Sequence, residues 1–473
     1  MPQNTLKPLF ESYTGQSPAS IQELPTSGSH RRYFRLGGGG TTLMGVIGTS
    51  LEENRAFIEL ARHFRKKGLQ VPEVLAVSED GFAYLQEDLG DQVLFDALAR
   101  GRENGVYSPE EKDLLRRTIE QLPRIQFLGG EGLDWRVCFP QEAFDGRMID
   151  FDLNYFKYCF LKATGIEFNE IQLQEDFEKF KTDLLLEEDN TFLYRDFQAR
   201  NVMIRDGQPW FIDFQGGRRG PIYYDVASFI WQARSRFPEA LREELIEAYL
   251  HALQQFKQVD EARFRSRLRL FVLFRTLQVL GAYGFRGYFE KKPHFIASVP
   301  YALQNLRTLL RTPFTEYPYL NKVLQEMAVK PELNVVQEDH RLEVRIFSFA
   351  YKKGIPADTS GNGGGYVFDC RSVNNPGKYE YYRQFNGTDP EVIKFLEDDG
   401  EVTVFLESVY KLVDAHVQRF IERKFTNLQV SFGCTGGQHR SVYCAEHLAR
   451  HLAHRFNIKI VLTHRELNQE KLL

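Results

Sequence analysis

The stretch from residue 194 to 214, YRDFQARNVMIRDGQPWFIDF, constrains this chain more than any other part of its sequence. Its runs VMIR and WFIDF are short and apolar, and they are separated by the turn sequence DGQ, a pattern that predicts a β-hairpin. The hairpin would carry Asn201 and Asp213 at its two ends, with Asp196 on the loop that precedes it. A fold containing this stretch therefore brings two carboxylates and one amide together.

These three side chains suit magnesium-dependent phosphoryl transfer from ATP. Oxygen atoms are the ligands that Mg²⁺ prefers, so Asn201 and Asp213 are candidate metal ligands. A carboxylate on the preceding loop can orient an attacking hydroxyl and accept its proton, which makes Asp196 the candidate catalytic base. The same spacing occurs in protein kinases. The alternative is a polar β-turn in which Asp196 and Asn201 only form the turn.

Further motifs around this stretch resemble a known family. The chain is similar to the aminoglycoside phosphotransferase and choline kinase group, and most similar to the bacterial N-acetylmuramate/N-acetylglucosamine 1-kinase (AmgK) type. The similarity lies in the motifs YRDFQARNVMIRDG, FIDFQ and GPIYYDVAS (220–228). The resemblance implies an ATP- and Mg²⁺-dependent kinase with a bilobal, protein-kinase-like α+β fold. By position it makes Asp225 a structural support of the catalytic loop. Tyr194 stands where the family usually has His.

The N-terminal segment predicts the smaller lobe of such a fold, which would bind the nucleotide. Residues 27–48 alternate like a two-stranded hairpin, and a helix is expected from about Leu51 to Gly68. Ser27, Gly28 and Ser29 are expected to cover the phosphates, although an ordinary flexible hairpin end has the same composition. The resemblance places backbone groups near Gln86 and Glu87 against adenine.

The lysine that usually pairs with the α- and β-phosphates in kinases is missing from this segment, since no lysine occurs between Lys7 and Lys66. Arginine can bind phosphate with two parallel hydrogen bonds. Arg31 and Arg32, beside the Ser/Gly loop, or Arg35 are therefore the candidates to replace it.

The middle of the chain, about 108–185 and 226–328, has apolar residues at helical spacing and predicts a helical C-lobe. In the related sugar kinases the late helices also line the acceptor pocket. On that resemblance, Arg275, Tyr283 and Arg286 are candidate sugar contacts.

A second domain is expected after residue 340, because the helical period gives way to short strands there. Strands are expected at RLEVRIFSFAY, YVFDCRSV, LQVSFG and KIVLTHRE, with three helical stretches among them. This order predicts a small α/β domain with a mainly parallel sheet. The expected boundaries are 1–90 for the N-lobe, 91–328 for the C-lobe, 329–340 for a linker and 341–473 for the second domain.

The second domain has one prominent motif, VSFGCTGGQHRSVYCAEHL (430–448), which reads as strand, tight loop and helix. A glycine-containing loop at a helix N-terminus collects backbone N–H groups around an anion, so the motif predicts a phosphate site. Cys434 and Arg440 also have the C-x5-R spacing of cysteine-dependent phosphatases. A tight structural turn is the remaining alternative.

This motif, with FSFAYKKGIP, VFDCRSVNNPG and FNGTDPEV, resembles the C-terminal domain of the RNase adapter RapZ over about residues 343–467. The resemblance implies a sensor that binds an amino-sugar phosphate such as glucosamine-6-phosphate, and RNA. Residues 341–473 contain 18 Lys/Arg and 16 Asp/Glu, so the positive charge expected of an RNA binder is weak. The candidate pocket residues are Asp369, Arg371, Asn375, Cys434, Thr435, Gly436, Gly437, His439, Arg440, Ser441 and His464.

Composition agrees with two globular domains in the cytoplasm. The chain has 473 residues, of which 42% are hydrophobic, and no run of eighteen apolar residues or basic-apolar leader is visible. Its five cysteines are odd in number and scattered, which favours reduced thiols. A net charge of -4 predicts no attraction to membranes. The oligomeric state, including a homo-oligomer, stays open.

The sequence thus favours a sugar kinase fused to a sugar-phosphate sensor. The alternative is a regulatory RNA or protein adapter whose kinase half has become a nucleotide-binding scaffold, for which the missing lysine is the best support. Retention of Asp196, Asn201 and Asp213 together argues against it.

Overall fold

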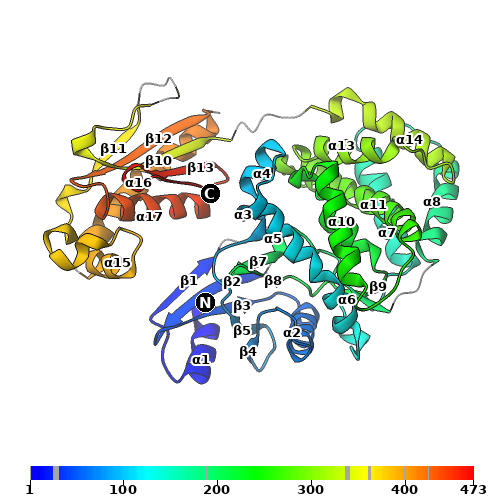
Figure 1. The fold of residues 1–473 in the computed structure, drawn as a ribbon, viewed down its shortest axis with the longest axis horizontal. Helices are drawn as coiled ribbons and strands as arrows, with labels where there is room; N and C mark the ends of the chain where they lie inside the picture. The colour runs from blue at the N-terminus through cyan, green and yellow to red at the C-terminus, as the bar shows by residue number, and fades with distance from the viewer. Residues whose placement is uncertain are drawn as a thin grey trace. The chain divides into compact units, whose positions relative to one another are not determined.

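The computed structural model describes residues 2–24, 31–186, 190–335, 341–358, 360, 364–398, 400–423 and 425–473. The chain divides into two compact units, Met1–Val336 and Gln337–Leu473 (Figure 1). Each unit has its own large hydrophobic core.

The first unit begins with an antiparallel sheet of order β1-β2-β3-β5-β4. Its members are β1 (Ser20–Leu24), β2 (Arg32–Gly38), β3 (Thr41–Ile47), β4 (Val74–Val77) and β5 (Ala83–Glu87). Helix α1 (Pro2–Thr14) contributes Leu6 and Phe10 to a small core on one face, with Phe34 and Leu36 of β2. Helix α2 (Leu51–Lys66) joins the main core with Phe57 and Phe64, and Ser50 caps its N-terminus.

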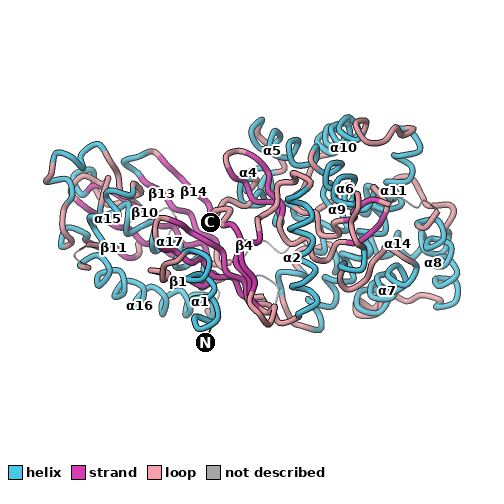
Figure 2. Tube along the Cα trace, turned by 90° about the horizontal axis from the view of Figure 1, so that it is seen from below, coloured by secondary structure: helices cyan, strands magenta, loops and turns pink. Residues whose placement is uncertain are grey.

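The rest of this unit is mainly helical, as Figure 2 shows by colour. Its central helix, α11 (Glu261–Gly284), packs against α7, α9 and α13. The helices are α3 (Leu94–Ala97), α4 (Ala99–Asn104), α5 (Pro109–Glu120), α6 (Leu122–Gly130), α7 (Gly146–Phe156), α8 (Glu170–Leu184), α9 (Tyr223–Ile230), α10 (Glu239–Leu253), α11, α12 (Pro293–Ile296), α13 (Val299–Leu310) and α14 (Pro318–Val329).

In the described part of the chain, one helix is long and apolar enough by length and composition to cross a membrane. It is α11 with the π-helical turn that follows it, Glu261–Phe289, and 61% of its most apolar window is buried. Burial of this extent is what the core helix of a helical lobe requires.

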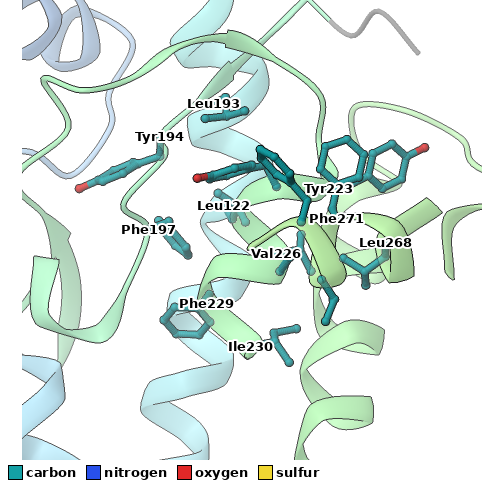
Figure 3. Packing of buried hydrophobic residues seen from close by; sticks show 14 of the residues in the cluster. Leu122, Leu193, Tyr194, Phe197, Tyr223, Val226, Phe229, Ile230, Leu268 and Phe271 are labelled. Carbon is teal, nitrogen blue, oxygen red and sulfur yellow. The ribbon is translucent and has the colours of Figure 1, made fainter. Parts of the chain in front are cut away.

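Between the helices lie two short antiparallel pairs, β6 (Thr191–Leu193) with β9 (Arg218–Gly220), and β7 (Val202–Arg205) with β8 (Gln208–Phe211). The second pair confirms the predicted hairpin, although its second strand ends two residues before Asp213. Aromatic packing holds the loop between β6 and β7. Tyr194 and Phe197 of this loop lie in the buried cluster with residues of α9 and α11 (Figure 3).

The second unit is an α/β sheet of order β11-β12-β10-β13-β14. The strands β10 (Glu343–Ala350), β11 (Tyr366–Asp369), β12 (Asn427–Cys434) and β13 (Lys459–His464) are parallel, as predicted, and β14 (Gln469–Leu472) is antiparallel. Helix α17 (Arg440–Arg455) packs on the sheet, α16 (Glu401–Glu422) packs on α17, and α15 (Pro390–Glu397) packs on α16. The loop 435–439 therefore lies at the carboxyl end of β12, where parallel sheets commonly bind ligands.

Five elements were absent from the sequence prediction: α1, β1, β6, β9 and β14. The four strands have three to five residues each, too few for an alternating pattern to stand out. Leu6 and Phe10 are apolar and four residues apart, a helical spacing that could have predicted α1.

Candidate active site

The loop between β6 and β7 is held by one buried carboxylate. Asp225 of α9 accepts hydrogen bonds from the backbone N–H of Tyr194 (2.7 Å) and of Arg195 (2.9 Å). Arg195 has a φ of 75°, a left-handed conformation that a non-glycine residue rarely adopts. The Tyr194 hydroxyl donates to the carbonyl of Ile212, so this residue ties the loop to the chain just before Asp213.

Asp196 is the exposed member of the site, with 46% of its side-chain surface accessible. Its backbone carbonyl accepts a 2.8 Å hydrogen bond from the Asn201 amide, which fixes the two residues relative to each other. The Arg275 guanidinium of α11 lies 3.6 Å from the Asp196 carboxylate. Gln198 donates to the same carboxylate at 3.3 Å. An accessible carboxylate held between two donors can accept a proton from a bound hydroxyl.

Asp213 lies beyond the end of β8 with a φ of 66°. Its carboxylate accepts a 2.8 Å hydrogen bond from the Gln215 amide. Burial raises the pKa of Asp213, and the negative charge of Asp196 raises it further, against the lowering effects of Gln215 and Arg31. The two carboxylates therefore repel each other in the absence of a cation.

The donor set fits a hard divalent cation. The side-chain amide nitrogen of Asn201 donates a hydrogen bond to the Asp196 carbonyl, so the amide oxygen of Asn201 points to a different side. Among the described residues, the buried Gln215 amide oxygen has no hydrogen-bond partner. Carboxylate and amide oxygens with an unsatisfied acceptor beside them are the groups that bind Mg²⁺.

Of the three arginines proposed to replace the missing lysine, Arg31 is the one that acts on Asp213. Its side chain is 2% exposed, and its guanidinium donates to the Glu53 carbonyl (2.9 Å) and lies 3.4 Å from the Glu53 carboxylate on α2. It also acts electrostatically on Asp213. Gln215 donates to both Glu53 (3.3 Å) and Asp213, so these four side chains form one connected group.

The other two arginine candidates have carboxylate partners elsewhere. Arg32, on the opposite face of β2, makes a two-bond pair with Glu23 of β1 at 2.7 and 2.8 Å. Arg35 pairs with Asp88 and Asp91 just after β5. The structure thus separates the three arginines and brings only Arg31 to Asp213.

The other predicted nucleotide contacts are less well defined. Ser27, Gly28 and Ser29 lie outside the described residues. Gln86 is buried, and within the described chain its amide oxygen lacks a hydrogen-bond partner. The Glu87 carboxylate pairs with Arg205, and its backbone N–H donates to the Glu73 carbonyl (2.9 Å).

A buried polar network extends from Asp196 into α11. The Gln278 side chain accepts from the Tyr224 hydroxyl (2.7 Å) and from Arg275, and it donates to Asp152 (2.8 Å). Burial raises the pKa of Asp152 to about 6, against the lowering effects of neighbouring arginines. Sequence reasoning missed Asp152 and Gln278 because nothing in their local pattern distinguishes them from other helical polar residues.

In the second unit, the loop after β12 wraps around the Cys434 thiol. The Gly437 N–H donates to Cys434 Sγ (3.2 Å), and the Ser441 hydroxyl lies 3.2 Å from the same sulfur. Thr435 and Gly436 are exposed, whereas Cys434 and Ser441 are buried. An anion that binds here would contact the exposed part of this loop.

Two arginines flank this loop in different ways. Arg440, at the start of α17, is buried and donates to the carbonyls of Val373 (2.9 Å) and Arg371 (3.2 Å). Arg371 is half exposed, pairs with Asp369 (2.6 Å) and lies over the Tyr351 ring. Arg440 therefore holds the segment that carries Arg371 against the loop.

The remaining predicted pocket residues separate into two groups. Asn375 caps the turn at Gly377 (3.2 Å), and His439 bonds the Tyr382 carbonyl (3.0 Å), so both order the segment beside the loop. His464 has no exposed surface, and its two ring nitrogens bond Ser348 (2.8 Å) and Glu446 (3.2 Å). The geometry does not support direct ligand contact by His464, because no ring nitrogen is left to bind one.

A model of the phosphotransferase enzyme family (APH) matches residues 20–265, a little more than half of the chain. The chain belongs to this phosphotransferase family. The sheet and helical lobe of its first unit are the protein-kinase-like fold of that family. A model of the RapZ C-terminal domain matches residues 342–468, and the mainly parallel sheet of the second unit agrees with it. This phosphotransferase therefore carries a RapZ C-terminal domain.

Two curated relatives of this phosphotransferase, both called nucleotide-binding proteins, come from Pseudothermotoga lettingae and Thermosipho melanesiensis. The first is 36% identical over 136 residues, covering 29% of this chain and 46% of its own length. The second is 39% identical over 127 residues, covering 27% and 43%. The chain spans less than half the length of these curated relatives.

Solved structures similar to the phosphotransferase include a putative aminoglycoside phosphotransferase from Ralstonia eutropha, with 11% identity, a TM-score of 0.44 and coverage of 68% of this chain and 98% of that one. A choline/ethanolamine kinase family protein from Mesorhizobium loti has 15% identity, a TM-score of 0.44 and coverage of 69% and 100%.

Proposed function

We propose that this phosphotransferase transfers the γ-phosphate of ATP to a hydroxyl of an amino sugar such as N-acetylmuramate or N-acetylglucosamine. The observation that carries the proposal is the meeting of Asp196, Asn201 and Asp213 at one end of the β7–β8 hairpin. This set supplies a base and oxygen ligands, the groups that phosphoryl transfer to an alcohol needs.

In this mechanism Asp196 accepts the proton of the attacking sugar hydroxyl at its carboxylate. The positively charged Arg275 guanidinium lies 3.6 Å from this carboxylate and helps to position it. Asp225 keeps the loop in its left-handed conformation at Arg195, and the Asn201 bond to the Asp196 carbonyl sets the reach of the base. Magnesium held by Asn201 and Asp213 would neutralise charge on the phosphates.

Arg31 is proposed to bind the phosphates in place of the missing lysine. Glu53 orients its guanidinium, as a helix glutamate orients the phosphate-binding lysine in protein kinases. Ser27, Gly28 and Ser29 remain proposed phosphate-loop residues, and the chain around Gln86 and Glu87 remains the proposed adenine contact. Arg32 stays a weaker proposal because Glu23 already pairs with it.

The test is ATP turnover by the full chain over a panel of amino sugars, with Asp196→Asn as the inactive control. Turnover that requires one amino sugar and Mg²⁺ supports the proposal. Binding of ATP without transfer of its phosphate to any sugar would instead favour the alternative, a regulatory adapter whose kinase half is a nucleotide-binding scaffold.

For the second unit we propose a sensor of an amino-sugar phosphate such as glucosamine-6-phosphate. Support comes from the exposed Thr435–Gly436 loop at the N-terminus of α17, with Arg371 beside it. The buried thiol and the use of Arg440 by backbone carbonyls favour binding over the cysteine-dependent phosphatase alternative. RNA remains a weaker proposal because charges in this unit are nearly balanced.

Cys434→Ser distinguishes the two alternatives. A sensor would keep most of its affinity for glucosamine-6-phosphate in calorimetric titration, because the loop binds through backbone N–H groups, and it would release no phosphate. Cys434-dependent release of phosphate from the sugar would establish the phosphatase instead.

A further inference from the structure

Arg275 reaches Asp196 from a position that three other side chains fix. Its Nε donates to the Ser228 hydroxyl (3.1 Å), one terminal nitrogen donates to the Gln278 side-chain oxygen, and the other lies 3.6 Å from the Asp196 carboxylate. Its guanidinium also lies over the Tyr224 ring, 5.8 Å from the centroid. Because a guanidinium is planar and rigid, a bond at one nitrogen sets the direction of the others. The position of Gln278 therefore affects how Arg275 meets Asp196.

The Gln278 side chain has one orientation that satisfies its neighbours. Its oxygen accepts from Arg275 and from the Tyr224 hydroxyl (2.7 Å), and its nitrogen donates to Asp152 of α7 (2.8 Å). Arginine only donates hydrogen bonds, and an ionised carboxylate only accepts them. A reversed amide would turn its N–H₂ group toward Arg275 and its oxygen toward Asp152, so both contacts would be repulsive. The ionised Asp152 carboxylate thus fixes the amide orientation that holds Arg275.

Close packing of α7 on α11 keeps Asp152 within reach of Gln278. A Cβ atom at Gly281 of α11 would lie 2.9 Å from the backbone nitrogen of Phe156 at the end of α7. The helices approach this closely because glycine has no side chain. Asp152 and Gln278 are only 4% and 8% exposed, so their hydrogen bond belongs to the packed interior of the lobe.

Asp152 can change its charge within this interior. The titratable groups that act on it are Arg195 of the catalytic loop, Arg218 of β9, Arg275 of α11, Tyr155 of α7 and Tyr224 of α9. Burial raises the pKa of Asp152 to about 6, while the three arginines act to lower it. Asp196 and Asp225 are further carboxylates near Arg195 and Arg275. Asp152 therefore gains a proton, and ceases to be a pure acceptor, as the pH falls through about 6.

We propose that Asp152 and Gln278 are positioning residues for phosphoryl transfer, which act through Arg275 to hold the Asp196 carboxylate where the acceptor hydroxyl meets it. The proposal rests on the proposed function and adds two buried residues to it. Ionised Asp152 favours transfer. Protonated Asp152 lets the Gln278 amide turn, which releases Arg275 from its position against Asp196. A displacement of about 1 Å near reacting groups can lower a rate about 100-fold, so the effect is measurable in kcat.

The test is a cycle of variants of the full chain, assayed with Mg-ATP and either N-acetylglucosamine or N-acetylmuramate, whichever the wild type phosphorylates faster. Asp152→Asn removes the pure acceptor, so Gln278 is no longer held in one orientation, and Gln278→Glu places two carboxylates together. We expect each to lower kcat about ten-fold and to leave the KM for ATP within about two-fold. The double variant again faces one amide donor with one carboxylate at unchanged net charge, so its kcat should return to within about three-fold of the wild type.

The pH dependence of kcat separates positioning from a loss of stability. Asn cannot gain the proton that Asp152 gains near pH 6. The ratio of wild-type kcat to Asp152→Asn kcat should therefore be largest above pH 6 and should approach one below it. Any effect of pH on Mg-ATP or on Asp196 is shared by both proteins and cancels in the ratio.

Gln126→Glu is the matched control. Gln126 is a buried glutamine that accepts from the Tyr249 hydroxyl at 2.7 Å, but it donates to the Ile222 carbonyl (3.0 Å) and not to a carboxylate. This variant should lower the melting temperature, as Gln278→Glu does, and its kcat relative to the wild type should not change with pH.

Two results would overturn the inference and leave the proposed function standing. One is a double variant whose loss is the product of the single losses, about 100-fold, because the two residues would then act independently. The other is a ratio of wild type to Asp152→Asn that stays constant across pH 6. If a variant does not fold, a wild-type kcat that fails to fall through pH 6 overturns the inference. No transfer to either sugar by the wild type would overturn the proposed function, and the inference with it.

Discussion

At the residue scale, Asp196 and Asp213 are both aspartates of one site, but their surroundings differ. Asp196 is half exposed beside Arg275, whereas burial raises the pKa of Asp213 and Gln215 donates to it. An accessible carboxylate suits a base that meets a substrate. A carboxylate that is costly to ionise suits a group that a cation would stabilise.

These surroundings predict two different defects. Asp196→Asn should abolish transfer, by roughly three orders of magnitude or more in kcat, with nucleotide affinity nearly unchanged, because only the reacting hydroxyl loses its partner. Asp213→Asn should weaken binding of magnesium with an ATP analogue, measured by calorimetry. Wild-type turnover by Asp196→Asn on the true acceptor would show the assignment of the base to be wrong.

Arg31 provides a second prediction at this scale. Arg31→Gln should lower kcat/KM for ATP by about 10- to 100-fold, because a charged contact worth about 1.5–3 kcal/mol is lost from the phosphates. Arg32→Gln is the matched control, since Arg32 pairs with Glu23 on the other face of β2. Equal effects of the two substitutions on the KM for ATP would contradict the assignment of Arg31.

At the scale of elements, α9 supports the catalytic loop through one side chain. Asp225 accepts two backbone N–H groups, and Asn at this position would offer one oxygen and turn N–H₂ toward the other donor. Asp225→Asn should therefore lower the free energy of unfolding by about 1–3 kcal/mol and reduce kcat more than the KM for ATP. Thermal unfolding and steady-state kinetics measure the two effects. An unchanged kcat would mean that the loop keeps its conformation without Asp225.

In the second unit, Glu446 of α17 links the helix to β13 and β14. Burial opposes ionisation of Glu446, yet hydrogen bonds from His464 and Lys471 outweigh it and lower its pKa to about 2. Because the pKa of Glu446 is lower in the folded protein than its unfolded value of 4.5, this carboxylate stabilises the fold fully at pH values above 4.5. The stabilisation falls as the pH drops towards 2.

This lowering predicts an acid-dependent loss of about 1–3 kcal/mol in the stability of the second unit between pH 4.5 and pH 2. Glu446→Gln should be less stable than the wild type at pH 7 and should lose less stability over that pH range. Denaturant unfolding, monitored through hydrogen exchange of the backbone amides of β13, measures this loss of stability. Parallel pH profiles of the two proteins would rule Glu446 out as the cause.

At the scale of the whole molecule, a phosphotransferase and a RapZ C-terminal domain share one chain. If the second unit senses a phosphorylated amino sugar, the fusion is expected to act as feedback on the kinase. Linkage then requires reciprocity: a ligand that changes the affinity of the kinase for its substrate has its own affinity changed by the same factor.

Calorimetric titration of glucosamine-6-phosphate, with and without an ATP analogue and acceptor sugar, tests this coupling in the full chain. We expect a change of about five-fold or more in affinity, the lower range of allosteric coupling. Asp196→Asn is the useful background, because it prevents turnover during the titration. Identical affinities in both conditions would show that the two units are only tethered.

The sequence by itself determined the family, the hairpin that carries Asn201 and Asp213, and the mainly parallel sheet of the second unit. These features depend on local spacing, turn residues and strand patterns, which are read within a few residues of one another. The position of Asp225 within its helix could also be read in this way, because it belongs to a continuous motif.

Only the tertiary structure decided which arginine meets Asp213, that His464 is enclosed, and that Gln278 links Asp152 to Arg275. Arg31 and Arg32 are adjacent in sequence, Arg31 just before β2 and Arg32 as its first residue, yet one reaches Glu53 and the other Glu23. The residues that join Asp152 to Asp196 come from distant segments. They act together only because packing of the catalytic loop, α7 and α11 brings those segments to one place.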